Sequence, residues 1–307
     1  MGFYSEVLLP LISANDNLRI IRYFQQRQLL AMGMDCGQCH RPMELRPKQV
    51  KDGFAWFCVN ARCVNRHNIK SVRDSSFFQK SHVPLAKHLQ LIYLWSQDAP
   101  VKTAVENTGL SKKTVIQWYA NHRRTCSDYF IQNPIQMGGP GVILEIDESL
   151  FRHKPKYHRG RQPQRNGAWV FGIVDTSSTP ALGYMQIVDN RTARTLLGII
   201  QQIALPGSII WSDSWRAYRA INQRLPQYQH QMVNHSLNFV DPVTGVHTQH
   251  VESYWNKAKL KFKRMHGSRR DLLPSYLEER MWRDRFGRST QDAFDNLVRH
   301  IFLDHPV

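Results

Sequence analysis

Three acidic residues stand where this sequence could hold catalytic metal ions: Asp147, Asp213 and Glu252. Asp147 ends the apolar run VILEID and Asp213 ends the run SIIWSD, so both carboxylates are expected at one edge of a sheet, where ligands collect in open α/β folds. Two such charges about 4 Å apart repel by roughly 4 kcal/mol at an effective dielectric constant of 20, so their clustering requires cations. A pair of Mg²⁺ ions about 3.5–4 Å apart can activate a water or a 3′-hydroxyl for attack on a phosphodiester.

A helix packed beside that edge would supply the third carboxylate. In HTQHVESYWNKAKLKFKR, residues 247–264, apolar side chains recur at steps of three and four, and Glu252 borders the buried stripe that they form. Lys259 and Lys263 share the helix face of Glu252, so they are expected to follow a phosphate backbone away from the metal ions. The predicted stripe consists of Val251, Tyr254, Trp255, Ala258 and Phe262.

Spacing alone does not single out these three carboxylates, because a chain with 24 acidic residues offers many triples. Glu148 is a competitor for Asp147, although strand alternation points the two side chains to opposite faces. His247 and His250 near Glu252 would suit a zinc enzyme, and a hydrogen-bonded or DNA-facing histidine is the simpler interpretation. Both alternatives stay open at this level.

The charge of the chain indicates a polyanionic partner. The 41 Lys and Arg residues exceed the 24 Asp and Glu residues, for a net charge of +17, and such an excess favours nucleic acid over a membrane. No apolar run approaches the ~18 residues that a membrane helix needs. Residues 152–165 contain basic side chains and no acid, which predicts either phosphate contacts or a solvated basic loop. The predicted phosphate contacts are Lys154, Lys156, Arg159 and Arg161.

Four of the five cysteines are paired in a way that predicts a structural zinc site. Cys36 and Cys39 are separated by two residues, and Cys58 and Cys63 by four, which is close to the spacing of a zinc ribbon. Four thiolates would satisfy Zn²⁺ without an open position, and four unlinked buried thiols are the alternative. His40 and His67 could replace one cysteine, whereas Cys126 is expected to be a small core residue. Zinc binding of order 10 kcal/mol would stabilise this part of the chain.

Residues 101–124 have the layout of a helix-turn-helix motif. Gly109 would form the turn, Ser111 would cap the second helix, and that helix would carry Val115, Ile116 and Tyr119 inward. A purely structural helical pair is the alternative. The residues expected to meet DNA near the start of the second helix are Lys112, Lys113 and Gln117.

The chain is expected to divide near the Pro/Gly-rich segment 133–141. Residues 1–80 would form an N-terminal helix and a zinc ribbon, and residues 81–135 a helical DNA-binding segment. Residues 140–307 read as strands in a meander followed by alternating helix and strand, ending in helices. This order predicts an α/β fold with a mixed sheet covered by helices.

The sequence resembles the Merlin superfamily of cut-and-paste DNA transposases, a DDE group related to bacterial insertion-sequence transposases. The resemblance covers roughly residues 34–286. It is carried by the cysteine segment, SVRDSSFFQKSHVPL, LEIDESLF, KYHRGR, WVFGIVD, IWSDSWRAY and VNHSLNFVDPVTGVHTQHVESYWNKAK. It implies an RNase H-like catalytic fold, and it places the three catalytic carboxylates on Asp147, Asp213 and Glu252.

The resemblance further implies a DNA transposase that binds the terminal inverted repeats of its element, cleaves DNA and transfers strands with two Mg²⁺ ions, for which Mn²⁺ can substitute. The partners would be double-stranded DNA and a second copy of the chain, in the nucleus of a eukaryote or the cytoplasm and nucleoid of a bacterium. A captured transposase that binds or regulates DNA without cutting it is the main rival. A nuclease acting on RNA/DNA hybrids is a third possibility, which the N-terminal zinc and helical segments disfavour.

Overall fold

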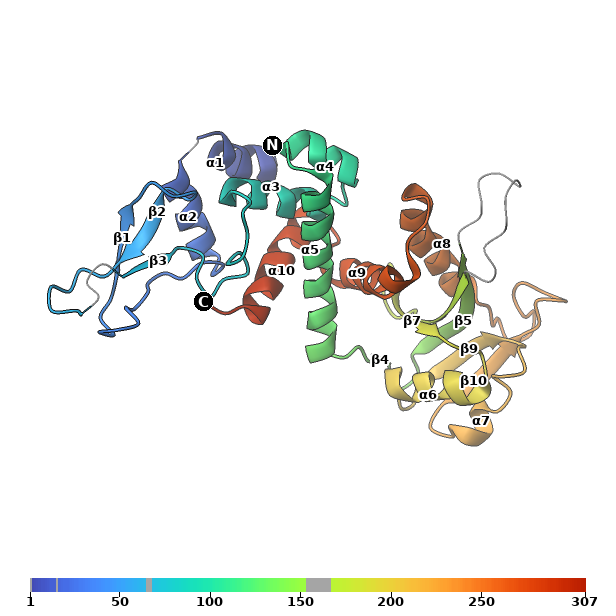
Figure 1. Ribbon diagram of the computed structural model, residues 1–307. Helices are drawn as coiled ribbons and strands as arrows, with labels where there is room; N and C mark the ends of the chain where they lie inside the picture. The colour runs from blue at the N-terminus through green and yellow to red at the C-terminus, as the bar shows by residue number, and fades with distance from the viewer. Residues whose placement is uncertain (1, 15, 65–67, 153–166) are drawn as a thin grey trace. The chain divides into compact units, whose positions relative to one another are not determined.

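The computed structural model describes residues 2–14, 16–64, 68–152 and 167–307 of the 307-residue chain (Figure 1). The chain forms two compact units, of which the first comprises Met1–Tyr129 and Phe286–Val307 and the second Phe130–Arg285. The predicted phosphate contacts Lys154, Lys156, Arg159 and Arg161 lie outside the described residues, as does His67.

The first unit joins a small sheet to a set of helices. Its antiparallel sheet has the order β1 (Glu44–Pro47), β2 (Phe54–Phe57), β3 (Ile69–Ser71). Phe24, Phe78 and Trp95 are fully buried in this unit, and the rings of Phe24 and Phe78 meet edge-on at 5.2 Å. The helical elements are a π-helical turn (Tyr4–Leu8), α1 (Leu9–Ser13), α2 (Asn17–Gln26), α3 (Leu85–Ser96), α4 (Val101–Thr108), α5 (Lys112–Gln132), which reaches the boundary, and α10 (Thr290–Asp304).

The predicted pair of helices around Gly109 is confirmed. Gly109 ends α4 in the left-handed region, at φ +68°, which favours glycine. Ser111 Oγ accepts the backbone N–H of Thr114 at 3.1 Å and caps α5. One inward residue was predicted wrongly: Ile116 is 47% exposed, because α5 buries positions 115, 118, 119 and 122 instead.

The second unit contains a five-stranded mixed sheet of order β10–β9–β5–β6–β7. β5 (Ile143–Arg152), β6 (Gly167–Asp175) and β7 (Leu182–Val188) form an antiparallel meander, and β9 (Ile209–Asp213) and β10 (Gln229–Val233) run parallel to β5. This sheet with its helices confirms the RNase H-like α/β class. The remaining elements are β4 (Met137–Gly138), α6 (Ala193–Ile203), β8 (Ala204–Leu205), α7 (Ile221–Arg224), α8 (Gln249–Arg264), a 3₁₀ turn (Arg270–Leu272) and α9 (Leu273–Phe286).

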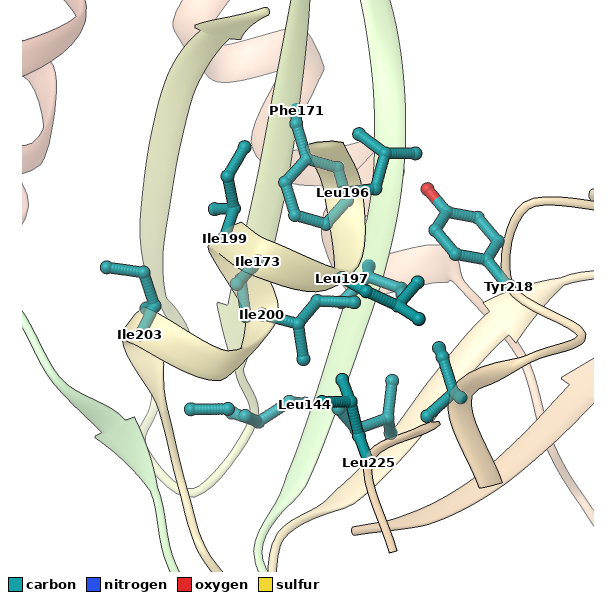
Figure 2. Close-up of a cluster of buried hydrophobic side chains, with 14 of the residues drawn as sticks. Leu144, Phe171, Ile173, Leu196, Leu197, Ile199, Ile200, Ile203, Tyr218 and Leu225 are labelled. Atoms are coloured by element: carbon teal, nitrogen blue, oxygen red, sulfur yellow. The ribbon is translucent and has the colours of Figure 1, made fainter. Parts of the chain in front are cut away.

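Each face of this sheet carries its own apolar core, because successive residues of a strand point to opposite faces. Leu144 and Ile146 of β5 pack with α6 on one face, in the cluster that Figure 2 shows. On the other face Phe151 packs with residues of α8 and α9. As predicted, α8 buries Val251, Tyr254, Trp255 and Ala258, and Phe262 is partly buried.

Two glycines let α8 approach the sheet closely. A methyl group on Gly172 of β6 would lie 2.5 Å from the Trp255 ring, and one on Gly183 of β7 would lie 2.2 Å from the Tyr254 ring. Real side chains do not tolerate such distances, so these positions require glycine if α8 is to keep its place. The packing of these two rings against the glycines sets the distance between α8 and the sheet.

No helix in the described part of the chain is long and apolar enough to cross a membrane.

Candidate active site

Strand β5 presents its odd-numbered residues to helix α8. Glu145 accepts hydrogen bonds from the start of α8, Asp147 from Trp255 one turn later, and Ser149 from Lys259 at 2.6 Å. Further along, the ring of Phe151 meets that of Phe262. The helix therefore runs along one strand, with a polar contact to three alternate residues.

The prediction that Asp147 ends its strand is wrong: Asp147 lies in the middle of β5, and it is oriented by α8. Its Oδ2 accepts the indole N–H of Trp255 at 2.9 Å. Burial, together with the smaller effect of the Asp213 and Glu252 charges, raises the pKa of Asp147 to about 6. The three predicted carboxylates thus act on one another electrostatically, although they come from two strands and a helix.

Asp213 is the last residue of β9 and is held by the backbone that follows it. Its Oδ1 accepts the backbone N–H of Trp215 at 2.9 Å. The Arg191 guanidinium stacks 3.7 Å from the centre of the Trp169 ring and 5.0 Å from that of Trp215. Arg191 was not singled out from the sequence; its guanidinium stacks on both rings, and its charge acts on Glu148.

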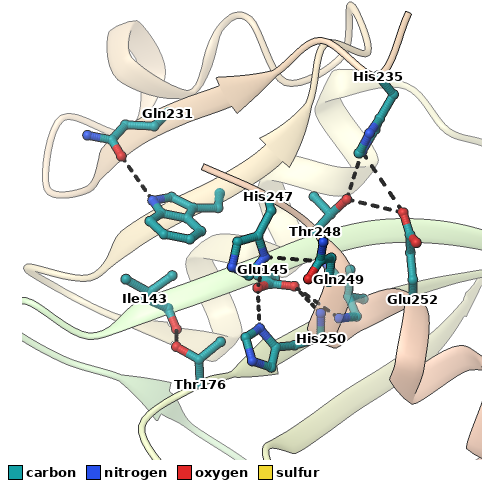
Figure 3. Close-up of polar contacts among 12 residues, drawn as sticks. Ile143, Glu145, Thr176, Gln231, His235, His247, Thr248, Gln249, His250 and Glu252 are labelled. Carbon is teal, nitrogen blue, oxygen red and sulfur yellow. Dashed lines mark hydrogen bonds and ion pairs between the residues drawn. The ribbon is translucent and has the colours of Figure 1, made fainter. Parts of the chain in front are cut away.

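Glu252 stands in the first turn of α8, with its side chain 53% exposed. Thr248 Oγ1 lies 3.4 Å from Glu252 Oε1, and His235 Nε2 lies 2.8 Å from the same hydroxyl and 4.0 Å from the carboxylate (Figure 3). The carboxylate is therefore oriented by polar neighbours while it stays open to solvent.

The donor set suits hard divalent cations. Asp147, Asp213 and Glu252 offer only carboxylate oxygens, which are the ligands that Mg²⁺ and Mn²⁺ prefer. The repulsion that raises the pKa of Asp147 is what a bound cation would relieve. In the described part of the chain, the ligand atoms of these three residues do not all lie within 4.8 Å of one another, so one ion cannot contact all three without movement.

Glu148 lies on the opposite face of the sheet from Asp147, as alternation predicted. Its neighbour there is Tyr218, which is fully buried on the α6 side. Burial, together with the smaller effect of the Asp147 charge, raises the pKa of Glu148 to about 7. Glu148 therefore has a raised pKa like Asp147, but its side chain lies on the other face of the sheet from the three carboxylates.

The lysines of α8 that were predicted to contact DNA differ in their surroundings. Lys259 is partly buried against β5, where its Nζ donates to Ser149 and lies 5.2 Å from the centre of the Phe151 ring. Burial lowers the pKa of Lys259, and the charge of Asp147 opposes this shift. Lys263, one turn further on, is exposed.

The residues predicted to contact DNA at the start of α5 are on its surface. Lys112, Lys113 and Gln117 are all exposed, and the amide of Gln117 donates to Asn121 at 3.1 Å. They belong to the first unit. The structure places them together on one helix and leaves their contact with DNA a prediction.

The four clustered cysteines converge as a zinc ribbon requires. Cys36 Sγ lies 3.9 Å from Cys63 Sγ, and Cys39 Sγ lies 3.7 Å from Cys58 Sγ. Four sulfurs each about 2.3 Å from a tetrahedral Zn²⁺ would lie about 3.8 Å apart, so the cluster fits the ion. The backbone N–H of Cys39 and of Gln38 lower the pKa of Cys36 to about 6, which favours the thiolate that zinc binds.

Cys126 and His40 are not part of the four-cysteine cluster. Cys126 is buried in α5 and donates to the His122 carbonyl at 3.4 Å, as expected for a core residue. The four-cysteine group is complete without His40.

Residues 136–284 match the family of ISXO2-like transposase domains. This segment contains Asp147, Asp213 and Glu252. An uncharacterized transposase-like protein of Haemophilus influenzae is 29% identical over 100 residues, which are 33% of this chain and 78% of that protein. These findings support a DDE transposase family. They agree with the broader class, the DDE transposases, to which the Merlin superfamily belongs. Membership of the Merlin superfamily itself stays a prediction.

Solved structures of an integrase and of a transposase align with this chain at low sequence identity. The catalytic core domain of HTLV-2 integrase, in complex with magnesium, is 13% identical and aligns over 47% of this chain and 84% of its own, with a TM-score of 0.30. A pre-cleavage Mos1 transpososome is 11% identical and aligns over 72% and 79%, with a TM-score of 0.28. At these scores the strand order, and not the superposition, defines the fold.

Proposed function

We propose that this chain is a DNA transposase that binds the terminal inverted repeats of its element and performs cut-and-paste transposition. The observation that carries the proposal is the electrostatic coupling of Asp147 with Asp213 and Glu252 on one side of an RNase H-like sheet. The match of residues 136–284 to a transposase domain family supports the same activity.

The three carboxylates would hold two Mg²⁺ ions, with Mn²⁺ as a substitute. Such ions supply an activated water or 3′-hydroxyl and steady the leaving oxygen. The chain's own contribution is to orient the carboxylates: Trp255 holds Asp147, and the backbone of Trp215 holds Asp213. Water would cut the element end, and the freed 3′-hydroxyl would then attack target DNA in line.

DNA would be bound by basic side chains on both units. Lys259 and Lys263 follow Glu252 along α8, and the Arg191 guanidinium stacks on Trp169 and on Trp215, which lies two residues after Asp213. We assign Lys154, Lys156, Arg159 and Arg161 to phosphate contacts from sequence alone. The first unit, with its zinc ribbon and the exposed start of α5, would recognise the element ends.

The finer assignments belong to the same proposal. We place the chain in the Merlin group on the motifs around Asp147, Asp213 and Glu252, and we expect two copies or more to hold a pair of element ends together. The protein would then act where its DNA is, in the nucleus of a eukaryote or the nucleoid of a bacterium.

An excision assay in cells tests the proposal. A donor plasmid would carry a marker between the two stretches of DNA that flank this gene, and the repaired donor would be counted in the presence of the protein. The proposal predicts excision with the wild type and none with Asp213→Asn at equal DNA binding. Equal activity of wild type and Asp213→Asn would favour the captured DNA-binding alternative.

A further inference from the structure

Glu145 is a buried carboxylate two residues before Asp147, and its side chain has no exposed surface. Its Oε2 accepts the backbone N–H of His250 at 2.8 Å and that of Val251 at 3.0 Å. These are free donors of the first turn of α8, so this oxygen binds the start of the helix. The other carboxylate oxygen of Glu145, Oε1, needs hydrogen-bond or metal partners of its own.

Two histidines converge on that remaining oxygen. His250 Nδ1 lies 2.5 Å from Glu145 Oε1, and His247 Nδ1 lies 3.2 Å from it (Figure 3). One ligand atom of each of the three residues lies within 4.8 Å of the others. The ring centres of Trp211 and His247 lie 5.2 Å apart in an edge-on arrangement, so Trp211 packs against the imidazole.

The contact of His247 with Glu145 requires either a shared proton or a shared metal ion. The backbone N–H of Gln249 also lies 3.4 Å from His247 Nδ1, which would make this nitrogen an acceptor in the metal-bound form. An acceptor nitrogen 3.2 Å from a buried carboxylate oxygen is repelled unless a proton or a metal ion lies between them. The two possibilities are therefore an N–H group that the histidine donates to Glu145 and a metal ion bound by both residues.

The ligand types and spacing suit a zinc-like ion. Two imidazoles and one carboxylate are a common Zn²⁺ set, and a tetrahedral ion about 2.0–2.1 Å from its ligands separates them by about 3.3 Å. The pair His247–Glu145 already has that separation, and His250 would move outward by less than about 1 Å. The His250 side chain is 49% exposed, so water could complete the coordination.

We propose that Glu145, His247 and His250 bind one Zn²⁺ ion that fastens the start of α8 to β5. Glu252 lies two residues after His250 on the same helix, so the ion would fix the position of the Glu252 carboxylate relative to the sheet. This site is separate from the three acidic residues and from the four cysteines. Its existence does not depend on whether the protein cuts DNA.

The test is the zinc content of the full-length chain. Wild type, His247→Ala and His250→Ala would be dialysed against micromolar Zn²⁺ with millimolar Mg²⁺, which keeps the acidic site supplied with its preferred ion, and their metal content would be measured by elemental analysis. The proposal predicts about two zinc ions per wild-type chain and about one per variant, the remaining ion being held by the cysteines. His82→Ala, in the other unit, is the matched control and should bind as much zinc as the wild type.

Folding is checked separately, because removal of a histidine could lower the zinc content by unfolding the protein. The variants should show the wild-type circular dichroism, and added Zn²⁺ should raise the melting temperature of the wild type further than that of either variant. Equal zinc content and equal zinc-dependent stabilisation in all four proteins would overturn the proposal. The cluster would then be held by histidine N–H groups that donate to Glu145.

Discussion

The indole nitrogen of Trp255 lies 2.9 Å from Oδ2 of Asp147 and donates a hydrogen bond to it. The two residues are 108 positions apart in the sequence, one on helix α8 and the other on strand β5. The bond lowers the pKa of Asp147 against the upward effect of burial. The helix that carries Glu252 therefore also orients the first aspartate.

Replacing Trp255 by Phe tests this link. The variant keeps a ring over Gly172 and loses the donor, so we expect DNA cleavage to fall by about 10-fold or more, in line with ~1.5–3 kcal/mol for a hydrogen bond to a charged group. The pKa of Asp147 should rise further. Tyr228→Phe, which removes a buried donor to the Ala204 carbonyl in the same unit, is the control and should cleave normally. Equal activity of the two variants would show that the indole bond is unimportant.

The glycine under Trp255 should be intolerant of a methyl group. We expect Gly172→Ala to destabilise the protein by about 1–3 kcal/mol, because the added carbon would meet the Trp255 ring at 2.5 Å. Gly198→Ala, on helix α6 with nothing within 4 Å, should be neutral or slightly stabilising. Urea unfolding followed by tryptophan fluorescence measures both. A neutral Gly172→Ala would mean that α8 can move away from the sheet without cost.

Metal-free stability should fall as the pH rises. The folded protein holds protons on Asp147 up to a pKa of about 6 and on Glu148 up to about 7, whereas the unfolded chain releases them near their ordinary values of 3.8 and 4.5. Because the folded state binds more protons between about pH 4 and 7, these two groups make folding less favourable as the pH rises through that window.

Two variants isolate this effect. Urea unfolding in Mg²⁺-free buffer should show a shallower decline for Asp147→Asn and for Glu148→Gln than for the wild type. Added Mg²⁺ should stabilise the wild type more at pH 7.5 than at pH 5, because it binds the deprotonated carboxylates. Identical pH profiles of wild type and both variants would contradict the assignment.

Loss of one zinc ligand should unfold part of the first unit. We expect Cys58→Ser to lose about one zinc ion per chain and to melt at a lower temperature, since zinc binding stabilises such lobes by order 10 kcal/mol. Cys126→Ser, which changes a buried thiol outside the cluster, should keep its zinc. Calorimetry with elemental analysis measures both quantities. Retention of zinc by Cys58→Ser would exclude the four-cysteine site.

The sequence predicted most of the elements that carry the candidate site. Apolar runs predicted β5 and β9, and the expected meander of strands corresponds to β5, β6 and β7. The buried stripe of α8 followed from its helical period. These elements have strong local patterns, which is why single-sequence reasoning finds them.

Other features depend on contacts that no local pattern encodes. Strand β10 was missed because QHQMV lies at the edge of the sheet and is largely exposed, so it lacks an apolar run. Glu145 was not singled out from the sequence, because its contacts with the start of α8 join residues more than 100 positions apart. Likewise, α10 packs in the first unit although it lies at the other end of the chain.

The central claim is that Asp147, Asp213 and Glu252 cut DNA with divalent metal. The most direct measurement is cleavage of labelled duplexes from the DNA flanking this gene, in Mg²⁺ and in Mn²⁺, by wild type and by Asp147→Ala at matched DNA binding. We predict cuts at a defined end, with a free 3′-hydroxyl, that depend on metal and vanish in the variant. Tight binding of the duplex by both proteins with no cutting in either metal, or equal cutting by both, would contradict the claim.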